Sequence, residues 1–162
     1  MSAARSPLPS IPENGSGKSS LLKVLLGESI PHSGTITTSA GLVVSYVPQD
    51  TAHLNGLLSH FAEKHHLDES LFKGILRKMG FERVQFEKKM EDFSAGQKKK
   101  VLLAASLCQP AHLYVWDEPL NFVDLHTRLQ ITSLLRQAQP TMLFVEHDRA
   151  FQEEIATQKI SL

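Results

Sequence analysis

A short stretch near the amino terminus combines glycine, serine and lysine in the way that phosphate binding requires. Residues 13–20 read Glu-Asn-Gly-Ser-Gly-Lys-Ser-Ser. Glycines allow backbone N–H groups to converge on phosphate oxygens at φ values that a side chain disfavours. We expect Lys18 to reach the β- and γ-phosphates of a nucleotide and the Ser19 hydroxyl to bind Mg²⁺. The alternative is a glycine- and serine-rich helix start without a ligand. The expected phosphate-binding residues are Asn14, Gly15, Ser16, Gly17, Lys18, Ser19 and Ser20.

Other polar residues follow apolar runs further along the chain. Asp117 and Glu118 end the run Leu-Tyr-Val-Trp, His147 follows Phe-Val-Glu, and Gln49 follows Tyr-Val-Pro. Transfer of a phosphoryl group to water needs positioning and charge neutralisation, which such groups supply. Each residue alone has an ordinary explanation: a histidine at a strand end is usually structural, and Gln49 fits a polar turn. The lysines at positions 98–100 are likewise typical of a solvated helix face.

Taken in order, these motifs resemble those of the ATP-binding-cassette (ABC) ATPases, over residues 13–162. Residues 46–49 resemble the Q-loop, and residues 113–118 resemble the Walker B strand with its Asp-Glu pair. Residues 93–97, Phe-Ser-Ala-Gly-Gln, resemble the LSGGQ signature, with alanine in place of its first glycine and phenylalanine in place of its leucine. Residues 121–124 look like the D-loop, and His147 looks like the switch histidine.

The resemblance implies an ATPase that uses ATP and Mg²⁺, with a role for each motif. Ser19, Gln49 and Asp117 would hold the metal, Glu118 would act as the base, and His147 would contact the γ-phosphate. Two cassettes of this family enclose two nucleotides head to tail, so a second cassette is an expected partner. The signature residues would cap the ATP of that cassette, and Asp124 would belong to the D-loop. The signature residues are Ser94, Ala95, Gly96 and Gln97.

The spacing of the motifs resembles the F subfamily of ABC proteins. The intervals from Lys18 to Gln49 and from Gln49 to Ser94 are compact, and residues 85–124 look like the second cassette of such a protein. The phrases Trp-Asp-Glu-Pro-Leu-Asn and Pro-Thr-Met-Leu-Phe-Val-Glu-His-Asp resemble the antibiotic-resistance branch, whose members bind the ribosome. The resemblance therefore implies a cassette acting on the ribosome in resistance. The alternatives are the nucleotide-binding subunit of a membrane transporter and an inactive truncated fragment.

The elements that position these residues alternate between strand and helix. Apolar runs at residues 113–116 and 142–145 are typical of strands buried on both faces of a parallel sheet. The pattern predicts an α/β fold, a P-loop NTPase of the ABC type, with a helical subdomain at about residues 50–94. Asp68 is a plausible N-cap for an amphipathic helix there, whose apolar face is expected to carry Leu71, Phe72, Ile75, Leu76 and Met79. Further helices are expected at residues 19–26, 96–109, 124–137 and 148–156, and further strands at residues 34–38, 42–47 and 158–162.

The first twelve residues do not resemble the family. Proline stands at position 12, where the phosphate-binding pattern has glycine, and prolines also occupy positions 7 and 9. Proline has no N–H and cannot sit in the middle of a strand ladder. We therefore expect residues 1–12 to be an irregular leader and residues 13–162 to be a partial nucleotide-binding domain whose leading strands are missing.

The composition excludes several classes of protein. Lysine plus arginine and aspartate plus glutamate both number 17, so the formal net charge is zero. A general attraction to nucleic acid or to an anionic membrane is not expected. No run is long enough for a transmembrane helix, so membrane insertion is not expected. The single cysteine, Cys108, fits a reducing, cytoplasmic setting and a small buried apolar role.

Overall fold

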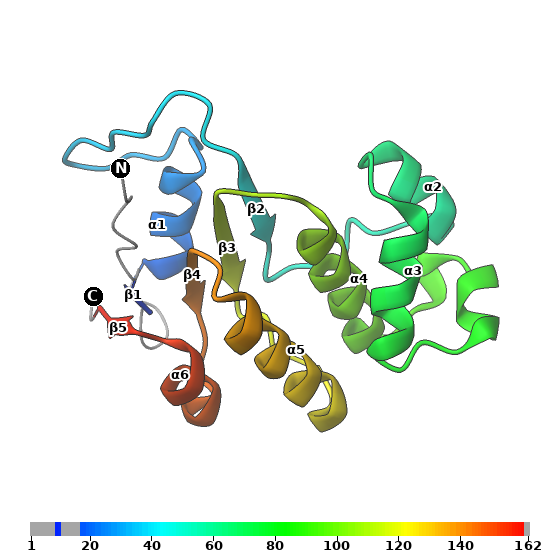
Figure 1. The fold of residues 1–162 in the computed structure, drawn as a ribbon. Helices are drawn as coiled ribbons and strands as arrows, with labels where there is room; N and C mark the ends of the chain where they lie inside the picture. Colours follow the sequence, from blue (N-terminus) through cyan, green and yellow to red (C-terminus); the bar gives the residue numbers. More distant parts are fainter. Residues whose placement is uncertain (1–8, 11–16, 161–162) are drawn as a thin grey trace.

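The structure is a computed structural model that describes residues 9–10 and 17–160. Its helices and strands alternate along much of the chain, as Figure 1 shows. The strands are β1 (Pro9–Ser10), β2 (Val44–Val47), β3 (Leu113–Asp117), β4 (Met142–Val145) and β5 (Gln158–Lys159). The helices are α1 (Lys18–Leu25), α2 (Leu58–Lys64), α3 (Glu69–Lys78), α4 (Ala95–Cys108), α5 (Leu125–Ala138) and α6 (Arg149–Ile155), with 3₁₀ turns η1 (Arg83–Glu87) and η2 (Met90–Asp92).

Strands β2, β3 and β4 form a parallel sheet with β3 in the centre. Successive side chains of β3 enter different cores, because strand residues alternate between faces. Val115 packs with Leu22 of α1, whereas Trp116 packs with residues of α4 and α5. Figure 1 shows α1 on one side of the strands and α4 and α5 on the other. Helices therefore cover both faces, which explains why all four residues of β4 are buried and confirms the expected fold class.

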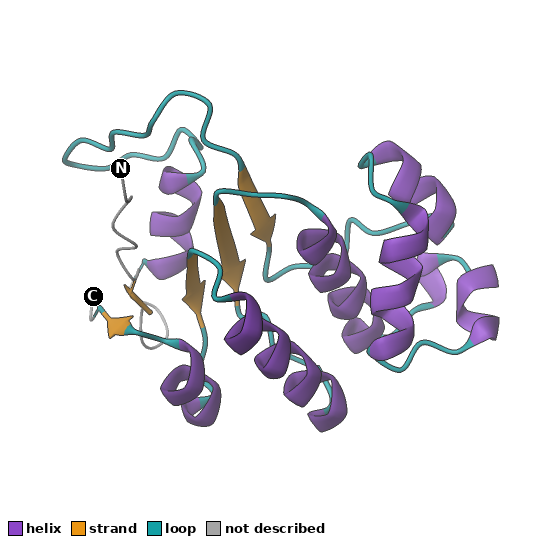
Figure 2. Cartoon of the chain, viewed as in Figure 1, coloured by secondary structure: helices purple, strands orange, loops and turns teal. Residues whose placement is uncertain are grey.

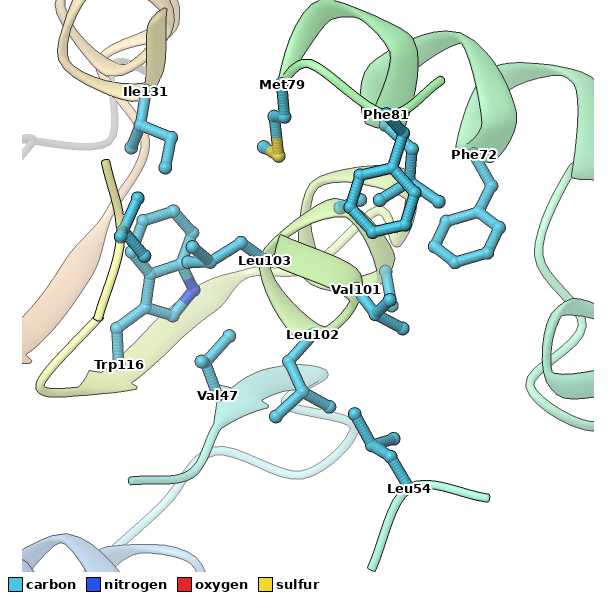
Figure 3. Close-up of a cluster of buried hydrophobic side chains, with 14 of the residues drawn as sticks. Val47, Leu54, Phe72, Met79, Phe81, Val101, Leu102, Leu103, Trp116 and Ile131 are labelled. Atoms are coloured by element: carbon cyan, nitrogen blue, oxygen red, sulfur yellow. The ribbon is translucent and has the colours of Figure 1, made fainter. Parts of the chain in front are cut away.

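Between β2 and α4 the chain forms helices and turns, as Figure 2 shows. Helix α3 begins after Asp68, whose side chain accepts a hydrogen bond from the backbone N–H of Leu71, so the expected N-cap is present. Its buried face carries Phe72 and Leu76 and packs on α4. Figure 3 shows Val101 of α4 on the side of Phe72 and Leu103 on the side of Trp116. Helix α4 thus joins this helical region to the sheet.

The structure corrects three expectations at element level. Residues 34–38 are exposed and form no strand, because they pair with no described strand. Leu71 was expected on the apolar face of α3 but is half exposed, since it lies about 100° around the helix from Phe72. Within the leader, Pro9–Ser10 forms β1 and pairs in parallel with β5. A proline is tolerated at the first residue of a strand, where its missing N–H breaks no internal ladder bond.

A buried polar network joins α4 to the sheet and gives a test of the packing. The Ser106 hydroxyl accepts a hydrogen bond from the Trp116 indole N–H at 2.9 Å and lies 2.7 Å from the Ser45 hydroxyl. Ser106→Ala leaves the buried Trp116 N–H without its acceptor and removes the hydroxyl partner of Ser45, so we expect the free energy of unfolding to fall by about 1 to 3 kcal/mol. Urea unfolding followed by Trp116 fluorescence measures this. Ser133→Ala, on the exposed face of α5, is the control, and equal midpoints for the two variants would contradict the account.

Candidate nucleotide site

The loops that follow β2, β3 and β4 meet at one edge of the sheet, because the strands are parallel. Gln49 follows β2, Asp117 and Glu118 lie at the end of β3, and His147 follows β4. Side chains predicted on separate motifs are thereby brought within contact distance of one another. The carboxylate of Glu118 is the centre of this group.

Three side chains surround the Glu118 carboxylate. The amide Nε2 of Gln49 donates to Oε2 at 2.9 Å, and Nδ2 of Asn121 donates to the same oxygen at 3.1 Å. Nε2 of His147 lies 3.4 Å from Oε1. The backbone of Glu118 has a φ of 47°, a left-handed value that is uncommon for a residue other than glycine. Strain of this kind is characteristic of functional sites, where surrounding contacts hold it in place.

Lys18 and Asp117 form a second part of the site. Both side chains are buried, at 5% and 2% exposure. Nζ of Lys18 and Oδ1 of Asp117 have no hydrogen-bond partner among the described residues. Burial raises the pKa of Asp117, and a hydrogen bond from Ser19 opposes that rise. A buried cation and a buried carboxylate oxygen without partners fit an anionic phosphate and a divalent cation, which would satisfy both atoms.

The start of α1 fits the same use. Gly17 precedes Lys18 with a φ of 78°, a conformation that glycine adopts without strain. Ser19 and Ser20 lie in the first turn of α1, where backbone N–H groups are free to face an anion. Asn14, Gly15 and Ser16, which the sequence assigns to phosphate binding, lie outside the described residues. The part of the predicted cradle that the structure describes is therefore Gly17 to Ser20.

The signature residues form the first turn of α4. The Ser94 hydroxyl accepts from the backbone N–H of Gln97 at 3.2 Å, and the Gln97 side chain accepts from the N–H of Ser94 at 3.0 Å. This capping box fixes the start of the helix, whose first residue is Ala95. A Cβ added to Gly96 would lie 2.4 Å from the carbonyl oxygen of Phe122, so the D-loop backbone requires glycine here.

Asp124 has a local structural role in addition to its predicted place in the D-loop. It caps α5 by accepting from the N–H of Thr127, and its Oδ2 lies 2.6 Å from Nζ of Lys100. Burial raises the pKa of Asp124, but the hydrogen bonds from Lys100 and Thr127 outweigh this and lower it to about 2. Lys100 and Thr127 both also donate to the carbonyl of Met79, so this cluster ties the end of α3 to α4 and α5.

Glu146 is a part of the site that the sequence analysis did not single out. Its side chain is buried, and its two oxygens accept backbone N–H groups from His147, Asp148 and Leu120. It thereby fixes the backbone on both sides of the Glu118 group. Its place directly after a wholly apolar strand could have identified Glu146 from the sequence. A carboxylate buried at such a position needs hydrogen-bond donors around it.

Two of the three lysines at positions 98–100 depart from the expected solvated face. Lys99 is 1% exposed, and its ammonium contacts the backbone beside Gln49 and Asp117. Lys100 is engaged by Asp124 and by the carbonyl of Met79. The sequence alone does not distinguish a buried lysine from an exposed one in this run, because the packing of α4 decides which side chain points inward. Cys108 is half-buried, and burial raises the pKa of its thiol to about 11.

Comparison with known families agrees with this geometry. The sequence model described as ABC transporter matches residues 11–121, which is more than half of the chain. The chain therefore belongs to the ABC transporter family, whose nucleotide-binding domains are P-loop ATPases that use ATP with Mg²⁺.

Among curated relatives, the chain is 31% identical to the ATP-binding protein Uup of Caulobacter vibrioides, over 92% of this chain and 26% of that protein. It is 30% identical to the ribosome protection protein VmlR of Bacillus subtilis, over 91% of this chain and 27% of that protein. The chain spans about a quarter to a third of the length of the curated relatives it matches.

A solved structure has the same fold. The chain aligns with a TM-score of 0.79 and 27% identity to the archaeal ribosome recycling factor aABCE1, solved with the ribosomal stalk protein aP1. That alignment covers 96% of this chain and 31% of the other. In the described part of this chain, no helix has the length and apolarity needed to span a membrane.

The pKa of Asp124 gives a test of the cluster beside the signature helix. Its folded-state pKa of about 2 lies below the ordinary value of 3.8, so ionised Asp124 stabilises the fold at neutral pH. This contribution is fully present above about pH 4 and is lost as the pH falls toward 2. We expect Asp124→Asn to be less stable than the parent in urea at pH 7, with the difference narrowing below about pH 4. Asp92→Asn is the exposed control, and a pH-independent difference would contradict the assignment.

Proposed function

We propose that this chain is one ATP-hydrolysing cassette of an F-type ABC protein that acts on the ribosome in antibiotic resistance. The observation that carries the ATPase assignment is the Glu118 carboxylate, which contacts Gln49, Asn121 and His147 beside the unpaired buried atoms of Lys18 and Asp117. The ribosomal assignment is supported by the compact motif spacing and by a relative whose name is ribosome protection protein.

The residues divide the work of hydrolysis between binding and activation. Lys18 neutralises the terminal phosphates, and the first turn of α1 directs N–H groups toward them. Ser19, Asp117 and Gln49 would hold Mg²⁺ through oxygen atoms, which are the ligands that this hard cation prefers. The amide Nε2 of Gln49 donates to Glu118, so its Oε1 is left for the metal. Bound Mg²⁺ would neutralise negative charge on the phosphates.

Glu118 accepts a proton from the attacking water. Contacts from Gln49, Asn121 and His147 hold its carboxylate in one orientation, so little reorganisation is needed when the water reacts. His147 is held by the turn that Glu146 fixes and would contact the γ-phosphate. Ser94, Ala95, Gly96 and Gln97 would cap the ATP of a second cassette, and Asp124 would place the D-loop at that interface.

The domain limits follow from this assignment. Residues 13–162 would form the cassette, with a helical subdomain at about residues 50–94 that carries α2 and α3. From residues 1–12, the short strand β1 would join the cassette through its pairing with β5. The protein would act in the cytoplasm, where ribosomes are found.

Nucleotide binding is the first test. Removing a charge-assisted contact to phosphate costs about 2 to 3 kcal/mol, so Lys18→Ala should weaken binding of a fluorescent ATP analogue roughly thirty- to hundredfold. Lys23→Ala removes the same charge from an exposed position on the same helix and is the control. Equal affinities for the two variants would remove Lys18 from the site.

Hydrolysis is tested separately from binding. Glu118→Gln keeps the shape of the side chain but loses the basicity of the carboxylate. Phosphate release at saturating Mg-ATP should therefore fall roughly hundredfold or more while nucleotide affinity is retained. Glu153→Gln, at an exposed position of α6, should match the parent. Unchanged turnover in Glu118→Gln would mean that another residue is the base.

The cellular target is tested by sedimentation. A base-deficient cassette holds ATP without hydrolysing it, so the full-length protein with Glu118→Gln should accumulate in the ribosomal fraction of a lysate in the presence of Mg-ATP. The parent should be distributed between ribosomes and the supernatant. Recovery of both proteins with membranes would instead favour a transporter subunit.

A further inference from the structure

Lys99 is a buried lysine of α4 whose ammonium group donates hydrogen bonds to three backbone carbonyls. Its Nζ donates to the carbonyl of Pro48 at 2.9 Å, to that of Gln49 at 3.3 Å and to that of Asp117 at 3.3 Å. The first two carbonyls belong to the loop after β2, and the third ends β3. One side chain of α4 therefore joins the two backbone segments that carry Gln49 and Glu118.

This arrangement has consequences for the backbone on both sides. The contacts to Pro48 and Gln49 are part-buried, and the contact to Asp117 is buried. Carbonyl groups shielded from water need hydrogen-bond partners, and the loop after β2 has left the sheet ladder that would supply them. A lysine presents three donors on a compact head, which matches three converging acceptors. The helix that carries Lys99 is fixed at its start by the Ser94 and Gln97 capping box, so the ammonium is held in place.

We propose that Lys99 is a positioning residue of the ATPase site, which holds the loop after β2 against the end of β3 so that Gln49 stays in contact with Glu118. This inference rests on the proposed function. It adds to that function a residue that touches neither nucleotide nor metal and that acts through the Gln49 backbone. The Gln49 side chain bonds to Glu118 at 2.9 Å only while its own backbone is held at this distance from β3.

The contacts of Lys99 also connect the start of α4 with the loop that carries Gln49 and with the end of β3. Ser94 is the N-cap of α4 and Ala95 to Gln97 begin the helix, so the signature lies two to five residues before Lys99. A displacement of the start of α4 would move the ammonium relative to the Pro48 and Gln49 carbonyls. Contact between the signature and a second cassette would thus be transmitted to Gln49 through this helix rather than through the nucleotide alone.

The experiment compares Lys99→Met with Lys98→Met, its neighbour on the same helix. Lys98→Met makes the same change of charge and length at a position whose side chain is not buried. In the loop after β2, the amides of Ala52 and Leu54 donate hydrogen bonds to Asp50 and Thr51. Hydrogen exchange of the nucleotide-free full chain should show these two amides exchanging roughly tenfold faster in Lys99→Met, because the loop loses the donor that holds it against β3. Amides of α3 should exchange as in the parent. Equal exchange at Ala52 and Leu54 in both variants would overturn the role of Lys99.

The second arm measures the Mg²⁺ requirement for binding a fluorescent ATP analogue. Lys99→Met should raise the Mg²⁺ midpoint roughly three- to tenfold and leave Mg²⁺-free nucleotide affinity unchanged, because Lys18 still holds the phosphates. In a Gln49→Ala background, Lys99→Met should add little further shift, since residues acting through one another are not additive. Full additivity would overturn the positioning role.

A third variant keeps the test informative if Lys99→Met does not fold. Lys99→Gln keeps an N–H donor near the carbonyls and should lie between the parent and Lys99→Met in both arms. If Lys99→Met unfolds, the comparison of Lys99→Gln with Lys98→Gln takes its place, with the same criteria. A parent chain that binds no nucleotide would refute the proposed function and with it any catalytic role for Lys99. A parent that binds, with Lys99 variants matching the Lys98 controls, would refute the Lys99 inference alone.

Discussion

The parallel pairing of β2, β3 and β4 is the constraint on which the site depends. The register sets Val47 beside Trp116 and Asp117 beside Val145, so the chain leaves all three strands at one edge. The backbone N–H of Glu118 donates to the carbonyl of Val145 at 2.9 Å and extends this pairing by one residue. A shift of one residue in any strand would exchange its two faces and turn the polar side chains at its end away from their partners.

Three carboxyl groups lie at this edge of the sheet, and each has different hydrogen-bond partners. Glu146 is satisfied by backbone N–H groups, so its charge is used to hold the turns around it. Glu118 is surrounded by side chains that a water or a phosphate could also contact. One buried oxygen of Asp117 has no hydrogen-bond partner among the described residues, and the ammonium nitrogen of Lys18 has none either. Unpaired buried groups are costly in a folded protein, and they persist where a ligand completes them.

The cationic side chains of α4 complement these anions from the other side. Burial lowers the pKa of Lys99 to about 8, and the neighbouring carboxylates of Asp117, Glu118 and Glu146 limit that fall. The ammonium is therefore mostly charged at neutral pH and can bind three carbonyls at once. Lys100 makes the equivalent link to Asp124 and to the end of α3. Two adjacent lysines thus attach the signature helix to different parts of the domain.

The sequence predicted the strands β3 and β4 and the helices around them well, because uniformly apolar runs bounded by polar residues leave few alternatives. It also predicted Gln49, Glu118 and His147, which the structure brings together. It failed at residues 34–38, where β-type composition has no described partner strand. It did not single out Glu146 or separate Lys99 from Lys98, since burial at those positions is decided by tertiary packing and not by residue type.

Binding of a divalent metal with ATP at the end of β3 can be measured directly through Trp116. It is the only tryptophan in the sequence, so its indole N–H gives a single signal in an ¹⁵N-correlated NMR spectrum, and it immediately precedes Asp117. Paramagnetic Mn²⁺ broadens the signals of nuclei close to it. We expect Mn²⁺ to broaden the Trp116 indole signal when a non-hydrolysable ATP analogue is present, and we expect Asp117→Asn to weaken this effect. A signal that stays sharp while the analogue is bound would place the metal elsewhere and contradict the account.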